Sequence, residues 1–209
     1  ETKNYLHNQV IAFLNENFIN SSIKYKLLHQ LSQAEMLQSR GQLNESNKLV
    51  QEIKKDAEKY GYDLIGYQIS DIEVSIVSKI QEKDFLEKLN IIYSERNKLL
   101  NKLVDTDFYK VNYRKMAVYY EEYVNGNEDL VTNARKIITH KKMKSFPKNA
   151  SIVGQINFLY TWEKYYSITG NLLFALETNK KIIDLFENKE SLISSHINVY
   201  FYSMLTFLD

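Results

Sequence analysis

Histidine is the residue of this chain best suited to metal binding, and the spacing of its four copies argues against such a site. No two of them lie three or four residues apart, so no single helix presents two imidazoles to one zinc ion. The chain has no cysteine, which excludes thiolate ligands, disulfides and thiol nucleophiles. We therefore predict no metal site on these histidines, which are His7, His29, His140 and His196.

Neither the glycines nor the paired carboxylates form a recognisable site. The six glycines are scattered and form neither a P-loop nor a dinucleotide-binding fingerprint, so no phosphate cradle is predicted. Acidic pairs such as Glu121–Glu122 and Glu128–Asp129 flank a turn, where water reaches them. A catalytic acid–base pair needs one carboxyl in a pocket that shifts its pKa. We predict a protein without cofactor that is not an enzyme.

Aromatic residues are dense in two stretches that we expect to be equivalent helices of successive repeats. Consecutive aromatics such as Tyr119–Tyr120 and Tyr165–Tyr166 point about 100° apart on a helix, so they cannot all face one packing seam. Packing in the core is one interpretation for each ring, and contact with a partner in a groove is the other, since tyrosine often anchors interfaces. The residues predicted to face the groove and bind a partner are Tyr120, Tyr123, Asn157, Tyr160 and Lys164.

Charge is balanced over the whole chain, with 27 basic and 26 acidic residues, and this argues against a nucleic-acid partner. One basic run stands out, with Arg135, Lys136 and His140 followed by the lysines of 141–148. Such cations complement the C-terminal end of a helix dipole in a solvated connector, and phosphate binding is the alternative. No apolar run is long enough to span a membrane, and we expect a cytoplasmic location.

Turn-like sites recur at nearly constant spacing and indicate how the elements are arranged. Gly41, Lys83, Gly126 and Gly170 follow one another at intervals of 42, 43 and 44 residues, and each separates two stretches with apolar residues three and four apart. Isoleucines at 65, 69, 72, 76 and 80 form one such stripe. A repeat of this length predicts an all-α, right-handed solenoid of antiparallel helical hairpins, with about ten helices.

The predicted hairpins span 22–60, 62–104, 107–140 and 150–187, with flanking helices at 4–17 and 190–208 in a single domain over 1–209. The third hairpin is predicted to start after Asp105–Thr106, a pair suited to helix capping. Pro147 interrupts helix in the connector at 141–148. Because the chain lacks an initiator methionine and both end helices lack a hairpin partner, we expect a fragment of a longer protein that self-associates through its exposed ends.

The hairpins resemble tetratricopeptide-type repeats. In the fourth hairpin Trp162, Tyr166, Gly170, Leu172 and Ala175 stand at the spacing of that family's large, aromatic, turn-glycine, apolar and small positions. In the first, Leu37, Gly41, Leu43 and Ser46 match in part. The family's unit is about 34 residues, whereas the longer unit here is also typical of HEAT or armadillo repeats. The chain is similar, too, to bacterial helical-repeat proteins from A/T-rich genomes.

The predicted solenoid favours a protein-interaction scaffold that binds a protein or peptide segment in a concave helical groove. The alternative is a ligand- or peptide-sensing regulatory segment of a longer signalling or transcription-regulating protein. Stacked hairpins offer an extended concave surface with a continuous core behind it, which suits either function.

Overall fold

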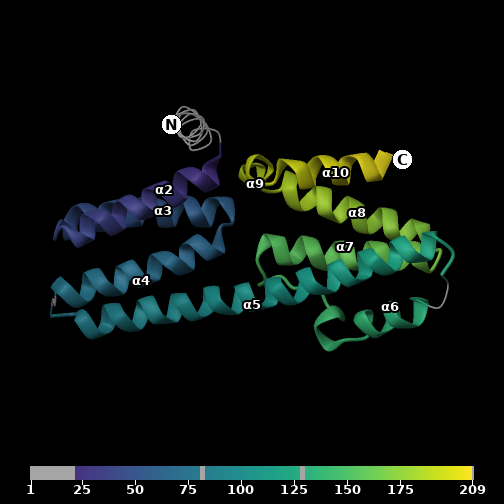
Figure 1. The fold of residues 1–209 in the computed structure, drawn as a ribbon, viewed down its shortest axis with the longest axis horizontal. Helices are drawn as coiled ribbons and strands as arrows, with labels where there is room; N and C mark the ends of the chain where they lie inside the picture. The colour runs from purple at the N-terminus through teal and green to yellow at the C-terminus, as the bar shows by residue number, and fades with distance from the viewer. Residues whose placement is uncertain (1–21, 81–82, 128–129, 209) are drawn as a thin grey trace, which may run out of the picture. The chain divides into compact units, whose positions relative to one another are not determined.

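A computed structural model describes residues 22–80, 83–127 and 130–208, apart from the side chains of the last two. Every regular element in these ranges is helical, with nine α-helices and one 3-10 turn (Figure 1). The predicted all-α class is confirmed. The chain forms two compact units, one ending at Leu99 and the other beginning at Leu100. The right-handed solenoid of tetratricopeptide type and the single domain over 1–209 stay predictions.

The first unit contains three helices and the first part of a fourth: α2 (Ile23–Ser39), α3 (Leu43–Tyr60), α4 (Asp63–Ile80) and α5 (Phe85–Val124). Helix α3 packs against both α2 and α4. Apolar residues recur three and four positions apart on each of these helices, so one face of each is buried. The core comprises Leu27, Leu31, Ala34, Val50, Ile53, Ala57, Ile65, Ile69, Ile72 and Ile76.

The second unit contains the rest of α5 and six further elements: α6 (Leu130–Ile138), the 3-10 turn η1 (Lys141–Met143), α7 (Ile152–Ile168), α8 (Leu172–Glu187), α9 (Glu190–Ser195) and α10 (Ile197–Leu208). Helix α8 packs between α7 and α10. The Ser151 hydroxyl caps α7 by accepting a hydrogen bond from the Gly154 amide at 2.9 Å. Ala175 is buried on α8, as the fourth hairpin predicts.

Glycines close the hairpin turns in the way that the spacing predicted. Gly41, Gly126 and Gly170 have φ values of 78°, 96° and 74°, in the left-handed region that disfavours side chains. After each glycine, the next amide donates to a carbonyl five residues back, as in the Schellman motif: Gln42 to Leu37, Asn127 to Glu122 and Asn171 to Tyr166.

The predicted break at Asp105–Thr106 is wrong, because α5 runs through it without interruption from Phe85 to Val124, a helix of 40 residues in all. Neither residue caps a helix here. The Thr106 hydroxyl donates back to the Lys102 carbonyl at 2.6 Å, and the Asp105 carboxylate pairs with Lys142 at 2.7 Å. With no glycine or proline nearby, the helix has no reason to stop. The predicted hairpins 62–104 and 107–140 therefore share one helix.

The two ends differ from the prediction in separate ways. The predicted last helix, 190–208, is divided into α9 and α10 at His196. The predicted first helix, 4–17, lies outside the described residues. Among those described, Phe201 and Leu205 of α10 are exposed.

Candidate functional site: a groove on the first unit

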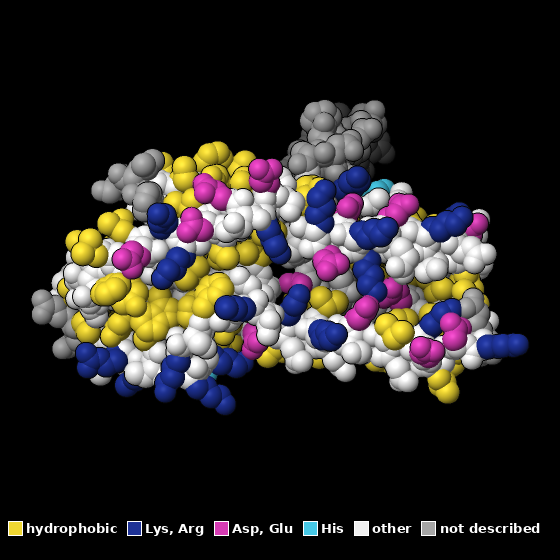
Figure 2. All heavy atoms as spheres, turned by 180° about the vertical axis from the view of Figure 1, so that it is seen from behind, with side chains coloured by type: hydrophobic (Ala, Val, Ile, Leu, Met, Phe, Trp, Pro, Cys, Tyr) yellow, Lys and Arg dark blue, Asp and Glu magenta, His cyan; other side chains and the backbone are white. Residues whose placement is uncertain are grey.

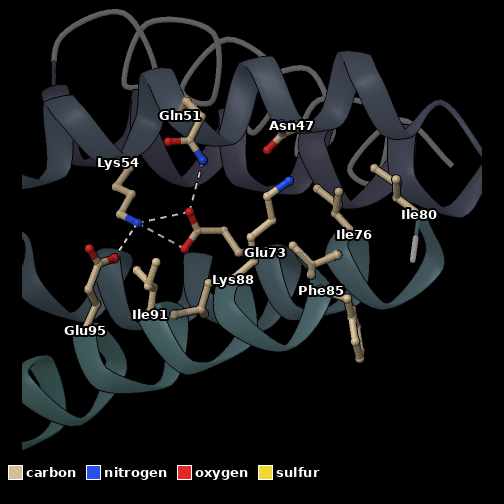
Figure 3. Close-up of a pocket in the computed structure, with 12 residues that line it drawn as sticks. Asn47, Gln51, Lys54, Glu73, Ile76, Ile80, Phe85, Lys88, Ile91 and Glu95 are labelled. Atoms are coloured by element: carbon tan, nitrogen blue, oxygen red, sulfur yellow. Dashed lines mark hydrogen bonds and ion pairs between the residues drawn. The ribbon is translucent and has the colours of Figure 1, made fainter. Parts of the chain in front are cut away.

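Helices α3, α4 and α5 enclose a groove of about 280 Å³ within the first unit (Figure 3). Helix α3 contributes polar side chains, and α4 contributes one carboxylate and several aliphatic side chains. Helix α5 contributes charged, aliphatic and aromatic side chains. The lining residues are Asn47, Gln51, Lys54, Glu73, Ile76, Val77, Ile80, Phe85, Lys88, Ile91, Ile92 and Glu95.

The polar side of the groove comes from one face of α3. Asn47, Gln51 and Lys54 are four and three residues apart, so the helix turn aligns their side chains. Gln51 and Lys54 both reach across to Glu73 on α4 (Figure 3). The groove therefore has a polar side that the chain's own hydrogen bonds hold in place.

Glu73 occupies a position of α4 where an apolar residue is expected. It lies between Ile69 and Ile76 on the isoleucine stripe and is only 6 % exposed. Its Oε1 accepts hydrogen bonds from Gln51 Nε2 at 3.0 Å and Lys54 Nζ at 3.0 Å, and Lys54 Nζ also donates to Oε2 at 3.2 Å. These donors compensate the carboxylate for the water lost on burial.

Lys54 joins two carboxylates that belong to different helices. Besides Glu73 on α4, its ammonium pairs with Glu95 on α5 at 2.7 Å. Burial alone would lower the pKa of Lys54, but hydrogen bonds to Glu95 and Glu73 outweigh it and raise the pKa above 10.5. Lys54 is therefore charged at neutral pH, and one ammonium faces two carboxylates.

The opposite side of the groove is aliphatic and partly open to solvent. Ile76 and Ile92 are buried, whereas Ile80 is partly exposed and Ile91 is 53 % exposed. Ile91 and Glu95 are four residues apart on α5, so they share one helix face. An incoming chain would meet an apolar contact and a carboxylate next to each other.

The residues predicted from the sequence to bind a partner lie on the second unit instead, and the structure brings only some of them together. Lys164 of α7 lies over the ring of Tyr120 of α5, with its ammonium 4.4 Å from the ring centroid. Asn157 Nδ2 donates to the Val153 carbonyl within α7, at 2.8 Å. Tyr123 is half-buried against the core of the unit.

The expectation that Tyr160 offers exposed aromatic area is wrong. This residue is 6 % exposed, and its ring stacks on Tyr113 with centroids 5.4 Å apart. Its hydroxyl lies 2.7 Å from the Ser203 hydroxyl of α10. The alternation of aromatic residues along α7 could not reveal this contact, because α10 follows about 40 residues later in the chain.

Lys164 is also less available than a surface lysine. Its side chain is 13 % exposed, and its ammonium lies 3.4 Å from the carboxylate of Glu163. Burial raises the pKa of Glu163, although the neighbouring Lys164 opposes the shift. Burial lowers the pKa of Lys164, but Glu163 and the nearby tyrosines outweigh it and raise the pKa. The Lys164 ammonium and the Glu163 carboxylate therefore pair with each other within the second unit.

Cations of the basic run around residue 140 have partners within the second unit, and Lys136 donates to Asn133 Oδ1 at 3.3 Å. Lys142 pairs with Asp105 at 2.7 Å and lies over the Phe108 ring, 5.1 Å from the centroid. Met143 is fully buried, and its carbonyl accepts a hydrogen bond from Trp162 Nε1 at 3.1 Å. The connector thus packs onto the second unit and is not a purely solvated loop.

Hydrophobic side chains also gather on the surface of the second unit (Figure 2). The exposed apolar residues at the start of α8 are Leu172, Leu173, Phe174 and Leu176. Tyr166 contacts Phe174, with ring centroids 5.4 Å apart.

Sequence reasoning missed the groove on the first unit. A signal was available in Glu73, a carboxylate on a stripe that otherwise consists of isoleucines. Its partner Lys54, and Glu95, which shares that lysine, are 19 and 22 residues away on other helices, so no local pattern connects the three.

No protein-family model matches the chain, and neither the curated proteins nor the solved structures contain a match to it. Within 22–80, 83–127 and 130–208, no helix is long and apolar enough to cross a membrane. The same residues hold no group of three or more potential metal ligands. The groove is therefore interpreted from its own chemistry.

Proposed function

We propose that this chain is a non-enzymatic protein-interaction module that binds a peptide segment of another protein in the groove of its first unit. The observation that carries the proposal is the groove itself, which joins an aliphatic side to a polar side fixed by Lys54 and Glu73. Recognition sites for peptides combine apolar contact area with a few oriented polar groups.

The size of the groove favours side chains of a segment over a cofactor. Pockets for drug-sized ligands usually measure about 300–1,000 Å³ and enclose most of the ligand. The 280 Å³ here lies at the lower limit of that range, and the groove is open to solvent, so it suits a few side chains of a segment. The alternative of a peptide-sensing regulatory segment shares this binding step and differs only in what the binding controls.

A matched pair of variants tests the proposal. Short random peptides displayed on phage are selected on the whole chain and then measured against Ile91→Glu and Leu86→Glu. Ile91 lines the groove, whereas Leu86 is 71 % exposed on the same helix and does not line it. Both variants add one carboxylate to the surface of α5.

We expect Ile91→Glu to abolish binding of the selected peptides and Leu86→Glu to retain it. The added carboxylate replaces an aliphatic contact of the groove with a charged side chain that has to lose its water against the apolar residues of the peptide, and this is unfavourable. Circular dichroism checks that both variants keep the wild-type helix content. Peptides that bind the two variants equally well would place the binding surface elsewhere, and a selection that enriches nothing would argue against a peptide-binding module.

A further inference from the structure

We propose that the bound segment carries a lysine or arginine next to aliphatic residues, and that this basic side chain binds Glu95. The inference rests on the proposed function, because it names the chemistry of the peptide that the groove takes. It follows from the balance of charge in the groove and from the position of Glu95 beside Ile91.

On the polar side of the groove, the single ammonium of Lys54 faces two carboxylates, so one negative charge is not neutralised. Lys54 is shared between Glu73 and Glu95, at 3.0 Å and 2.7 Å. The second lysine of the lining, Lys88, pairs with Asp84 at 3.1 Å, so that pair is neutral by itself. The cluster of Lys54, Glu73 and Glu95 therefore has a net negative charge and attracts a cation.

Glu95 is the member of this cluster that a ligand can reach. Its side chain is 44 % exposed, whereas Glu73 is buried. Lys54 binds Oε2 of Glu95, and within the described part of the chain Oε1 has no hydrogen-bond or ion-pair partner. A guanidinium or ammonium can approach Oε1 without displacing Lys54, and such charge-assisted hydrogen bonds are strong.

The neighbouring surface fits the hydrocarbon part of a basic side chain. Lysine and arginine have apolar stems and keep only their ends in polar surroundings. Ile91 lies one helical turn before Glu95 and exposes half of its surface (Figure 3). The stem would lie along Ile91, and the adjacent aliphatic residues of the peptide would contact the aliphatic lining of the groove, which includes Ile76 and Ile80.

The charged residues near Glu95 on the solvent-exposed side of the groove do not neutralise the negative charge of its carboxylate. Glu87 and Lys98 line an adjoining shallow depression together with Glu95, and their charges are opposite. Arg96, the next residue along the chain, is engaged with Asp71 at 2.7 Å. A basic ligand is therefore favoured over a neutral or acidic one of the same shape.

Three labelled pentapeptides test the inference against the whole chain by fluorescence anisotropy. Each has two leucines on either side of a central residue, which is arginine, glutamine or glutamate. We expect the arginine peptide to bind about tenfold more tightly than the glutamine peptide, as is typical for one partly exposed hydrogen-bonded charge pair. The glutamate peptide should bind least tightly.

Glu95→Gln is the decisive variant, and Glu52→Gln is its matched control. Glu52 is exposed on α3 and does not line the groove. In Glu95→Gln the arginine peptide should bind no better than the glutamine peptide, whereas Glu52→Gln should keep the tenfold preference. The preference should also shrink between about 0.1 M and about 1 M salt, because salt screens exposed charges.

The outcomes separate this inference from the proposed function. Equal binding of the arginine and glutamine peptides, lost together in Ile91→Glu, would overturn the basic specificity and leave the peptide-binding groove in place. Binding of the neutral glutamine peptide that Ile91→Glu does not reduce, or no binding of any peptide, would overturn both. Competition by free arginine amide as strong as by the arginine peptide would reassign the groove to a small molecule.

Discussion

Replacing Tyr160 with alanine tests whether the aromatic residues of the second unit are structural. The tyrosine is buried, stacks on Tyr113 and contacts Tyr202 edge to face with centroids 6.0 Å apart. Truncating a buried aromatic side chain to alanine usually costs about 3–5 kcal/mol, because transfer energy is lost and a cavity remains. We expect a loss of that size in the free energy of unfolding for Tyr160→Ala.

Tyr160→Phe isolates the contribution of the hydroxyl group. The Ser203 hydroxyl donates to the Val199 carbonyl at 2.9 Å, so it accepts a hydrogen bond from the Tyr160 hydroxyl at 2.7 Å. Burial raises the pKa of Tyr160 to about 12, as expected for a phenol that stays protonated in the core. Without this donor, Ser203 keeps a buried lone pair unsatisfied, and we expect a loss of about 1–2 kcal/mol.

Urea unfolding followed by tryptophan fluorescence measures both variants. Trp162 is the only tryptophan of the chain and lies on the same helix as Tyr160, so its emission reports on the second unit. The exposed Leu173 provides a control, because Leu173→Ala should change the free energy of unfolding by no more than about 0.5 kcal/mol. If Tyr160→Ala unfolds at the same urea concentration as the wild type, the side chain is exposed in solution and the packing argument is wrong.

Two further predictions concern buried positions of the same unit. Ala175→Leu should overpack α8 and lower the free energy of unfolding by about 1–3 kcal/mol, and an unchanged urea midpoint would show that the site has room. Glu163 has a raised pKa in the fold, mainly through burial, so ionised Glu163 disfavours folding once the pH exceeds about 4.5. Glu163→Gln should therefore match the wild type near pH 4 and become more stable relative to it as the pH rises to 7. A constant difference across that range would mean that the carboxyl is not buried.

Much of the helical pattern could be predicted because its causes are local. A left-handed glycine that ends a helix and an apolar stripe at helical spacing both lie within one or two turns of sequence. Gly41, Gly126 and Gly170 were identified in this way, and so was the isoleucine stripe of α4. The error at Asp105–Thr106 arose because the side chains of aspartate and threonine can either cap a helix end or bond to other groups from within a helix. Asp105 bonds to Lys142, 37 residues away, and this partner is invisible to a local argument.

The candidate site depends on contacts between helices, and this is why the sequence alone did not reveal it. Glu73, Lys54 and Glu95 come together only when α3, α4 and α5 pack. The aromatic residues misled for the same reason, since Tyr160 is covered by α10 through Ser203. Residue type and spacing predicted that the aromatic side chains of one helix cannot all pack against a single neighbouring helix. The sequence could not show which of these side chains a later helix would cover.

Helix α5 has a consequence for how this protein can be divided into expressible pieces. The border between the units, at Leu99 and Leu100, lies inside its 40 residues and not in a loop. A fragment cut there would expose about four amides or four carbonyls that the intact helix satisfies. A cut after Asn127 would leave α5 whole, because the hydrogen bond from the Asn127 amide to the Glu122 carbonyl closes the helix at the glycine turn. Deletion studies of the groove should therefore keep the entire helix, even though only its first three turns line the site.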